Sequence, residues 1–389
     1  AVQTKRQPGS SFKPFIYSAA LENGFTTSTI INDVPVVFEG SGQEESWRPE
    51  NYSNKFYGPT RMREALVRSM NLVSVRILLK MGINNAVRHI QPFGFRKAAL
   101  PKDPSLALGS GGASPWQMAG AFAVLANGGH VVDRYFIDRI IDAEGNVVFQ
   151  AEPITVCPSC ATAWAEDAAY DPGELAANAV DAAPDPAGEI PVYASAEEMI
   201  DQALEWRPNA NESPAFWADR NQAERVITAE NSYIVYDMMR DVIRRGTGRR
   251  VSELGRADLA GKTGTSNNRR DAWFAGFNRE LVGVAWVGFD DDARSLGAGE
   301  EGSRTALPMW KDFMADALED APEAPLEQPD DIVSVRINAE NGQLASAGAE
   351  DAMFEIFIAG TEPQALPDDY GFAEADVFVE QGGDDDSIF

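Results

Sequence analysis

The chain has 389 residues, of which 44% are apolar, enough for two or three domains or for one large domain with insertions. Its formal net charge of −27 argues against nucleic-acid binding, because phosphate backbones repel an acidic surface. Residues 151–230 carry a net charge of −13 and residues 312–389 a net charge of −20, so the remainder is mildly basic. We expect the chemistry in that remainder, and we interpret the acidic segments as solvated surfaces, with an acidic docking surface as the alternative.

The first predicted helix covers residues 11–22, where apolar side chains recur at helical spacing and Asn23-Gly24 provides a stop. Pro14 is tolerated there because it falls in the first turn, where backbone N–H groups have no intrahelical partner. Ser10 then lies at the helix N-terminus, and Lys13 lies about one turn further along the same face.

Three further elements complete the first part of a domain that we place at residues 1–150. A helical region spans residues 60–82 and is interrupted at Ser69-Met70-Asn71. Residues 114–126 predict another helix, and the alternating pattern of residues 131–150 predicts a β-hairpin.

Residues 151–224 break this pattern because they are rich in Ala, Pro and acidic residues. We interpret them as an insertion that forms a small subdomain or is partly disordered. The insertion contains Cys157 and Cys160, which are too few ligands for zinc, and His89 and His130 are far away in the sequence. A local disulfide or two free thiols remain open, whereas a thioredoxin-like site is disfavoured because no βαβ pattern surrounds the cysteines.

Regular structure returns in residues 225–320, which we assign as the second part of the domain. A helix is predicted over residues 231–245. Three short apolar segments separated by turns favour an antiparallel sheet, and they are residues 259–265, 272–278 and 281–289. A last helix over residues 305–319 would pack on this sheet, and residues 321–389 are predicted to be an acidic linker and a loosely ordered tail.

Three short motifs occur in chain order, namely Ser10-Ser11-Phe12-Lys13, Ser69-Met70-Asn71 and Lys262-Thr263-Gly264-Thr265. Each motif alone is weak evidence for a catalytic site, because Ser10 alone would be interpreted as a helix cap and Lys13 alone as a solvated helix residue. The motifs occur at a helix N-terminus, at a helix junction and on a strand. This combination is typical of the serine acyltransferases that include class A β-lactamases and penicillin-binding proteins.

These residue types suit an acyl transfer from Ser10. A serine hydroxyl is a weak nucleophile until a base removes its proton, and Lys13 can be that base only when it is neutral. Burial and a second cation both lower the pKa of a lysine, and Lys262 is the expected second cation. Ser69 would relay the proton towards a leaving amine, and Asn71 would hold a substrate amide and orient Lys13.

The third motif is expected to bind the substrate. The backbone N–H groups of Ser10 and Thr265 would stabilise the developing oxyanion. Thr263, Thr265 and the charge of Lys262 suit a substrate carboxylate, and Gly264 leaves room for the substrate backbone. We expect neither a metal nor another cofactor.

Longer segments around the motifs resemble the class A, bifunctional penicillin-binding proteins of Gram-negative bacteria. The segments are Arg6-Gln-Pro-Gly-Ser-Ser-Phe-Lys-Pro-Phe15, Ala107-Leu-Gly-Ser110, Arg245-Gly-Thr-Gly-Arg-Arg250, Asp258-Leu-Ala-Gly-Lys-Thr-Gly-Thr-Ser-Asn267, Asp271-Ala-Trp-Phe274 and Gly360-Thr-Glu-Pro363. The resemblance implies an α+β fold of the D,D-transpeptidase/β-lactamase type, an α/β/α sandwich with a five-stranded antiparallel sheet between helical layers. It also implies that Ser10 attacks the D-Ala-D-Ala end of a peptidoglycan stem peptide, and that β-lactam antibiotics acylate the same serine.

The resemblance further places such a domain on the periplasmic side of the bacterial inner membrane, after a membrane helix and a glycosyltransferase domain. No apolar run here is long enough to span a bilayer, and Ser10 follows Ala1 almost at once. We therefore expect the C-terminal part of a longer protein, without the strands that precede the active serine in this family. Contact with the membrane would come only through the missing anchor, and other cell-wall synthesis proteins are candidate partners.

Three alternatives remain open on the same motifs. A serine β-lactamase needs a glutamate that activates water, and Glu174-Leu-Ala-Ala-Asn178 has the required spacing. It lies 105 residues beyond Ser69 and inside the insertion, so we interpret it as a chance match. A D,D-carboxypeptidase would transfer the acyl group to water, and a penicillin-sensing domain would be acylated without catalysing a reaction.

Overall fold

The computed structural model describes residues 4–38, 47–143, 145–154, 156, 223–346 and 348–364. Its helices there are α1 (Lys13–Glu22), α2 (Met62–Val67), α3 (Asn71–Met81), α4 (Ile83–Ile90), α5 (Pro115–Ala126), α10 (Ala229–Arg245) and α11 (Leu307–Ala317). Its strands there are β1 (Ile30–Asp33), β2 (Gly58–Arg61), β3 (Arg139–Ile141), β4 (Val147–Gln150), β5 (Ala260–Thr265), β6 (Asp271–Phe277), β7 (Val282–Gly288), β8 (Ile332–Asn338) and β9 (Ala352–Ile358). The interior of the predicted insertion, with Cys157, Cys160 and Glu174, lies outside the described residues.

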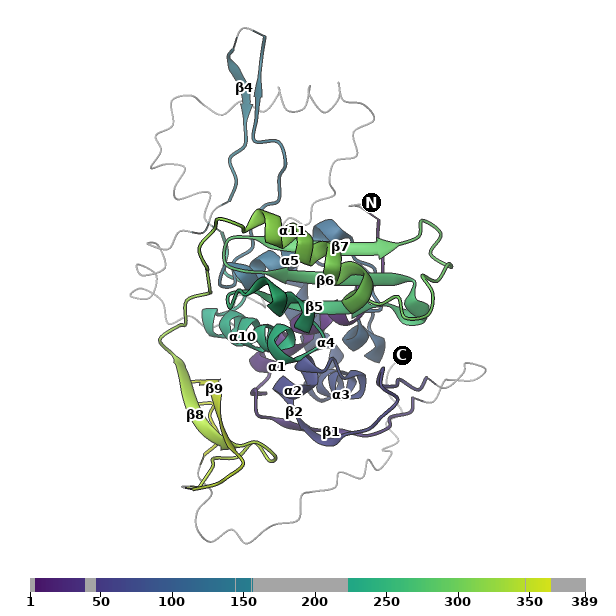
Figure 1. Ribbon diagram of the computed structural model, residues 1–389, viewed down its shortest axis with the longest axis vertical. Helices are drawn as coiled ribbons and strands as arrows, with labels where there is room; N and C mark the ends of the chain where they lie inside the picture. Colours follow the sequence, from purple (N-terminus) through teal and green to yellow (C-terminus); the bar gives the residue numbers. More distant parts are fainter. Residues whose placement is uncertain are drawn as a thin grey trace.

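The central sheet has the strand order β5–β6–β7 and is antiparallel throughout (Figure 1). Its register pairs Lys262 with Ala275 and Thr263 with Phe274, so the third motif lies along one edge of the sheet. The three predicted strands are confirmed. In the described residues the central sheet has three strands and not the five that the resemblance implied.

Helices cover both faces of this sheet, as expected for an α/β/α sandwich. Along β6, Ala272 and Phe274 pack with α11, and the alternate residues Trp273 and Phe277 belong to the larger core formed with α1, α5 and α10. Every residue of β6 is buried because neither face is open to solvent. The indole of Trp310 in α11 fixes the outer layer by donating to the carbonyl of Gly283 at 2.9 Å.

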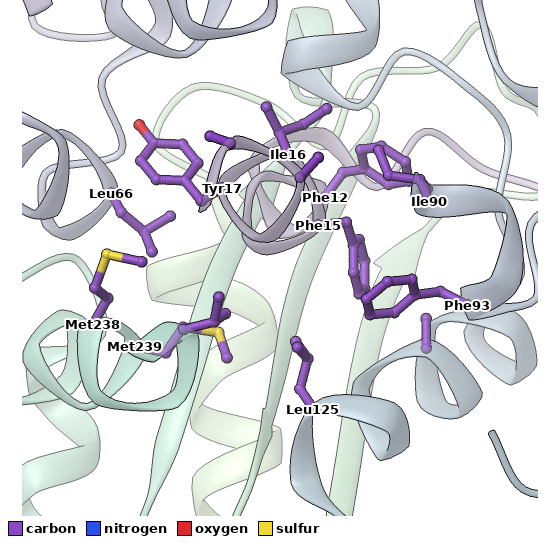
Figure 2. Close-up of a cluster of buried hydrophobic side chains, with 14 of the residues drawn as sticks. Phe12, Phe15, Ile16, Tyr17, Leu66, Ile90, Phe93, Leu125, Met238 and Met239 are labelled. Atoms are coloured by element: carbon purple, nitrogen blue, oxygen red, sulfur yellow. The ribbon is translucent and has the colours of Figure 1, made fainter. Parts of the chain in front are cut away.

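Helix α1 runs through the middle of the larger core (Figure 2). Phe15 is fully buried and makes edge-to-face contacts with Phe93, Phe95 and Phe122, at centroid distances of 5.2 to 5.5 Å. Truncating a phenylalanine in such a place costs about 3–5 kcal/mol. The segment that carries Ser10 and Lys13 is thus anchored in the larger buried core.

Two parts of the fold differ from the sequence prediction. Residues 60–82 do not start as a helix, because β2 pairs with β1 as far as Arg61 before α2 begins. The expectation of a loosely ordered tail after residue 333 is wrong for its first part, where β8 and β9 form an antiparallel hairpin. The predicted hairpin within residues 131–150 is confirmed as β3 and β4, and it extends away from the body (Figure 1).

A buried ion cluster fixes the β8–β9 hairpin to the rest of the molecule. The side chain of Glu355 in β9 lies between two arginines that flank the start of α2. Its Oε1 is 2.6 Å from Arg63 Nη2, and its Oε2 is 3.3 Å from Arg61 Nη1. Arg63 also contacts Asp237 of α10 at 2.7 Å, so the cluster joins three segments that are distant in the sequence.

None of the helices in the described ranges has both the length and the apolar character that crossing a membrane requires.

Candidate active site

Ser10 lies in a single turn of 3₁₀-helix, Gly9–Phe12, that leads directly into α1. The backbone N–H of Lys13 donates to the carbonyl of Ser10, which closes this turn. Side chains three residues apart are eclipsed in a 3₁₀-helix, so Ser10 and Lys13 lie on the same face. Among the described residues the hydroxyl of Ser10 forms no hydrogen bond, and it is available to a ligand.

Lys13 is fully buried, and its ammonium nitrogen is surrounded by oxygen atoms of the second motif. Nζ donates to the carbonyl of Ser69 at 2.8 Å, to the carbonyl of Met70 at 3.1 Å and to Oδ1 of Asn71 at 2.8 Å. The interruption predicted between the two helical segments of residues 60–82 is therefore a binding site for the lysine head group.

Ser69 occupies a backbone conformation that normally belongs to glycine. The N–H of Met70 donates to the carbonyl of Ala65 and that of Ser69 to the carbonyl of Leu66, which is the Schellman pattern at the end of α2. Ser69 has a φ of 58°, and at the equivalent end of α1 the residue is Gly24, with a φ of 80°. A non-glycine residue with positive φ costs on the order of 1 kcal/mol, and such strain concentrates at functional sites.

Ser69 has a hydroxyl that a glycine would lack, and this hydroxyl contacts the third motif. Lys262 of β5 is fully buried, and its Nζ donates to Oγ of Ser69 at 2.8 Å. The same Nζ lies 3.2 Å from the carbonyl of Thr263. The two lysines thus approach Ser69 from different sides, with Lys13 on its carbonyl and Lys262 on its hydroxyl.

Burial controls the charge of both lysines. It lowers the pKa of Lys13 well below its usual value, and the adjacent charge of Lys262 lowers it further. Burial also lowers the pKa of Lys262 to about 7. In the part of the chain that the structure describes, the polar partners of both lysines are carbonyl, amide and hydroxyl oxygens rather than carboxylates. Buried lysines are usually paired with an acid, so this arrangement favours a chemical role over a structural one.

Glycines allow the backbone of the Ser10 turn to contact β5 directly. A Cβ on Gly264 would lie 2.3 Å from the carbonyl oxygen of Pro8, and a Cβ on Gly9 would lie 2.4 Å from that of Thr265. A Cβ on Gly302 would in turn lie 2.3 Å from the carbonyl oxygen of Gly264. No other residue type fits these positions without movement, which explains the glycine in the third motif.

The two threonines of the third motif have partners that the sequence did not indicate. Oγ1 of Thr263 lies 2.7 Å from Oγ1 of Thr247, in the turn that follows α10. Oγ1 of Thr265 accepts a hydrogen bond from the backbone N–H of Gly302 at 3.1 Å. Thr247 lies in one of the segments that resemble the family, but nothing in the sequence indicated that its hydroxyl would contact Thr263.

Two further residues were missed altogether, namely Asn51 and Asp33. The amide of Asn51 contacts the backbone of Asn71, and Asp33 contacts the other side of that amide. Both lie in irregular or short segments without periodicity, and no sequence pattern identified them. The predicted residues Lys13, Ser69, Asn71 and Lys262 are joined by hydrogen bonds, and residues 263–265 continue from Lys262 along the same edge of β5.

Comparisons with known proteins identify the family of the chain. A family model described as "Penicillin binding protein transpeptidase domain" matches residues 1–289, and one described as "Penicillin-binding protein 1A, C-terminal domain" matches residues 328–371. The chain is 43% identical to penicillin-binding protein 1A of Pseudomonas aeruginosa, over 97% of this chain and 45% of that protein. The chain thus spans about half the length of the curated relatives it matches.

Solved structures show the same fold. The crystal structure of penicillin-binding protein 1A from Haemophilus influenzae matches with a TM-score of 0.75 and 34% identity, over 94% of this chain and 50% of that one. The PonA1 protein from Mycobacterium tuberculosis in complex with penicillin V matches with a TM-score of 0.57 and 21% identity, over 84% of this chain and 73% of that one. At that identity the second likeness supports the fold alone.

Proposed function

The chain belongs to the penicillin-binding protein transpeptidase family, and on that premise we propose that it is the serine D,D-transpeptidase part of a peptidoglycan synthase. The observation that carries the proposal is the position of Ser69 between two buried lysines without acidic partners among the described residues. An arrangement of this kind is costly for folding and useful for moving protons.

The first half-reaction forms an acyl-enzyme on Ser10. Neutral Lys13 keeps two of its three N–H donations, and its lone pair accepts the hydroxyl proton while Oγ of Ser10 bonds to the carbonyl carbon of the penultimate D-Ala of a stem peptide. The N–H groups of Ser10 and Thr265 stabilise the oxyanion. The bond to the terminal D-Ala then breaks, and the proton passes from Lys13 through the Ser69 hydroxyl to the leaving amine.

The second half-reaction reverses these steps with a different amine. An amino group of a neighbouring stem peptide enters where D-Ala left and gives a proton to Ser69 or Lys13 as its nitrogen attacks the acyl carbon. The bond between that carbon and Oγ of Ser10 breaks, and the hydroxyl regains its proton. The products are a cross-linked peptide and the free enzyme, so no other reactant is required.

The remaining motif residues would bind the donor. The cation of Lys262 attracts the terminal carboxylate, and the hydroxyls of Thr263 and Thr265 donate to it. Asn71 holds the peptide amide, and Gly264 lets the Ser10 turn pack against β5 beside it. A β-lactam presents a reactive carbonyl and a carboxylate at similar spacing, so the same groups would direct it to Ser10.

We also propose that the domain works on the periplasmic side of the inner membrane, within a longer protein that has a membrane anchor and a glycosyltransferase domain. The support is the family membership and the partial coverage of the relatives. Other cell-wall synthesis proteins are the expected partners, and the net charge gives no reason to expect nucleic acid.

A labelling experiment tests the proposal. The chain is incubated with a fluorescent penicillin, and the modified residue is identified by mass spectrometry, with Ser10→Ala as the control. We expect a stable adduct on Ser10 and release of D-Ala from a pentapeptide in amounts that rise with an added acceptor amine. Rapid, repeated hydrolysis of nitrocefin would indicate a β-lactamase instead. Release of D-Ala that does not respond to the acceptor would indicate a carboxypeptidase, and labelling without any release would indicate a sensor.

A further inference from the structure

We propose that Asp33 and Asn51 are positioning residues of the transpeptidase site, which orient Asn71 and through it Lys13. The inference rests on the proposed function, because it assigns a task to two residues next to the same site. Neither residue touches Ser10 or belongs to the three motifs. Both are nevertheless more than nine-tenths buried, at 0% exposure for Asp33 and 4% for Asn51.

The carboxylate of Asp33 fixes the direction of the Asn51 side chain. Nδ2 of Asn51 donates to Oδ1 of Asp33 at 2.8 Å and to Oδ2 at 2.9 Å, and it also lies 3.0 Å from the carbonyl of Lys55. Oδ2 accepts a further hydrogen bond from the backbone N–H of Tyr57. Every contact of Nδ2 is an acceptor, so the amide of Asn51 cannot turn over without losing all of them.

The other end of the same amide caps the helix that carries Asn71. Oδ1 of Asn51 accepts from the backbone N–H of Asn71 at 2.8 Å and from that of Leu72 at 3.3 Å. A helix cap normally comes from the residue just before the helix, but Met70 has no side-chain acceptor. The carbonyl of Met70 already accepts from Lys13, so the junction contributes its backbone to the lysine and the cap comes from Asn51.

The segment around Asn51 also orients the Asn71 side chain. The carbonyl of Glu50 accepts from Nδ2 of Asn71 at 2.7 Å, and this turns Oδ1 of Asn71 towards Nζ of Lys13 at 2.8 Å. Asp33 therefore acts on the base through Asn51, which holds the backbone of Asn71, and through the adjoining carbonyl of Glu50, which holds its side chain. A shift of about 1 Å in such a path is enough to lower a reaction rate 100-fold.

The substitution Asn51→Asp separates positioning from helix capping. Aspartate keeps an oxygen for the N–H groups of Asn71 and Leu72, but it puts a second oxygen against the carboxylate of Asp33. The double variant Asp33→Asn/Asn51→Asp restores a donor opposite an acceptor between these two side chains, and only the hydrogen bond to the carbonyl of Lys55 stays lost. A matched control exists at the far end of β5, where Nδ2 of buried Asn278 donates to buried Asp258 at 2.9 Å and Oδ1 of Asn278 accepts two backbone N–H groups.

The measurement is the second-order rate constant for acylation by fluorescent penicillin as a function of pH, on the 389-residue chain. We expect Asn51→Asp to lower the plateau roughly 10- to 100-fold. The acid limb should shift, because Lys13 loses a fixed acceptor for its ammonium form and the new carboxylate adds a charge near it, while Lys262, the other titratable group facing it, is unchanged. The double variant should recover part of the rate, because it restores the contact between residues 33 and 51 but not the one to Lys55.

The control and the thermal midpoint decide between positioning and general destabilisation. Asn278→Asp should also lower the midpoint, by less than Asn51→Asp because Arg256 keeps its salt bridge with Asp258, while its rate and acid limb stay as in the unchanged chain. An equal rate loss in Asn278→Asp, an Asn51→Asp rate within about twofold of the unchanged chain, or a double variant without recovery would each overturn the inference. If Asn51→Asp does not fold, Asp33→Asn gives the same readings, and an unchanged chain that resists acylation counts against the proposed function instead.

Discussion

Replacing Glu355 with alanine should release the β8–β9 hairpin from the body of the protein. The carboxylate is bound by Arg63 through Nη2 at 2.6 Å and Nε at 2.9 Å, and by Arg61 at 3.3 Å, with only 2% of the residue exposed. Removing one partner of a buried ion pair costs about 3–5 kcal/mol, because the other charge remains buried. Arg63 keeps Asp237 at 2.7 Å, so we expect the lower end of that range.

Hydrogen exchange followed by mass spectrometry measures this change where it occurs. A loss of about 3 kcal/mol corresponds to a rise of roughly 100-fold in the opening equilibrium of β8 and β9, since each 1.4 kcal/mol is a factor of ten. The matched control is Glu327→Ala, which removes an exposed ion pair with Arg279. This variant should change the opening free energy of β8 and β9 by less than about 1 kcal/mol. Similar exchange in the two variants would show that the buried cluster does not hold the hairpin.

Three further predictions concern the site itself. Lys13→Met should reduce penicillin labelling roughly 100- to 10,000-fold, and fast labelling would remove Lys13 from its role as base. Because the pKa of Lys262 is about 7, its charge is present below pH 7 and lost above it. The initial affinity for carboxylate-bearing β-lactams should therefore fall above pH 7, by at most roughly tenfold per pH unit. A flat profile, or the same slope in Lys262→Ala, would contradict this assignment. Gly264→Ala should lower acylation at least roughly tenfold, because its Cβ would lie 2.3 Å from the Pro8 oxygen. Gly112→Ala, where the nearest atom is at 3.4 Å, should leave the rate unchanged, and equal effects would refute the steric argument.

The sequence predicted the parts of the fold in which periodic apolar residues face one core. Helices α1, α3, α5 and α10 and the three strands of the central sheet are of this kind. It failed at β2, because Gly58-Pro-Thr-Arg61 has no alternation and pairs with residues almost thirty positions earlier. It failed again at β8–β9, because an acidic segment that includes Glu355 is typical of a solvated surface, and the sequence does not show that Arg61 of β2 and Arg63 of α2 contact it.

The site likewise contains residues that the sequence could predict and residues that it could not. Lys13, Ser69, Asn71 and Lys262 could be found because acyl transfer requires these residue types in fixed order. The left-handed backbone of Ser69 could not be found, since it depends on how α2 ends. Asp33, Asn51 and Thr247 were out of reach for a different reason: an isolated polar residue acquires its task only from neighbours that are distant in the sequence.

The glycine contacts between the Ser10 turn and β5 restrict how such a site can change. Where Gly9 meets Thr265, and Gly264 meets Pro8, the walls of the site are main chain, which a point mutation alters only by adding bulk. Most substitutions there would damage the normal reaction together with the reaction with an antibiotic. Side chains around the motif, such as Thr247, can change with less disturbance, because its hydroxyl contacts Thr263 without forming the main-chain wall.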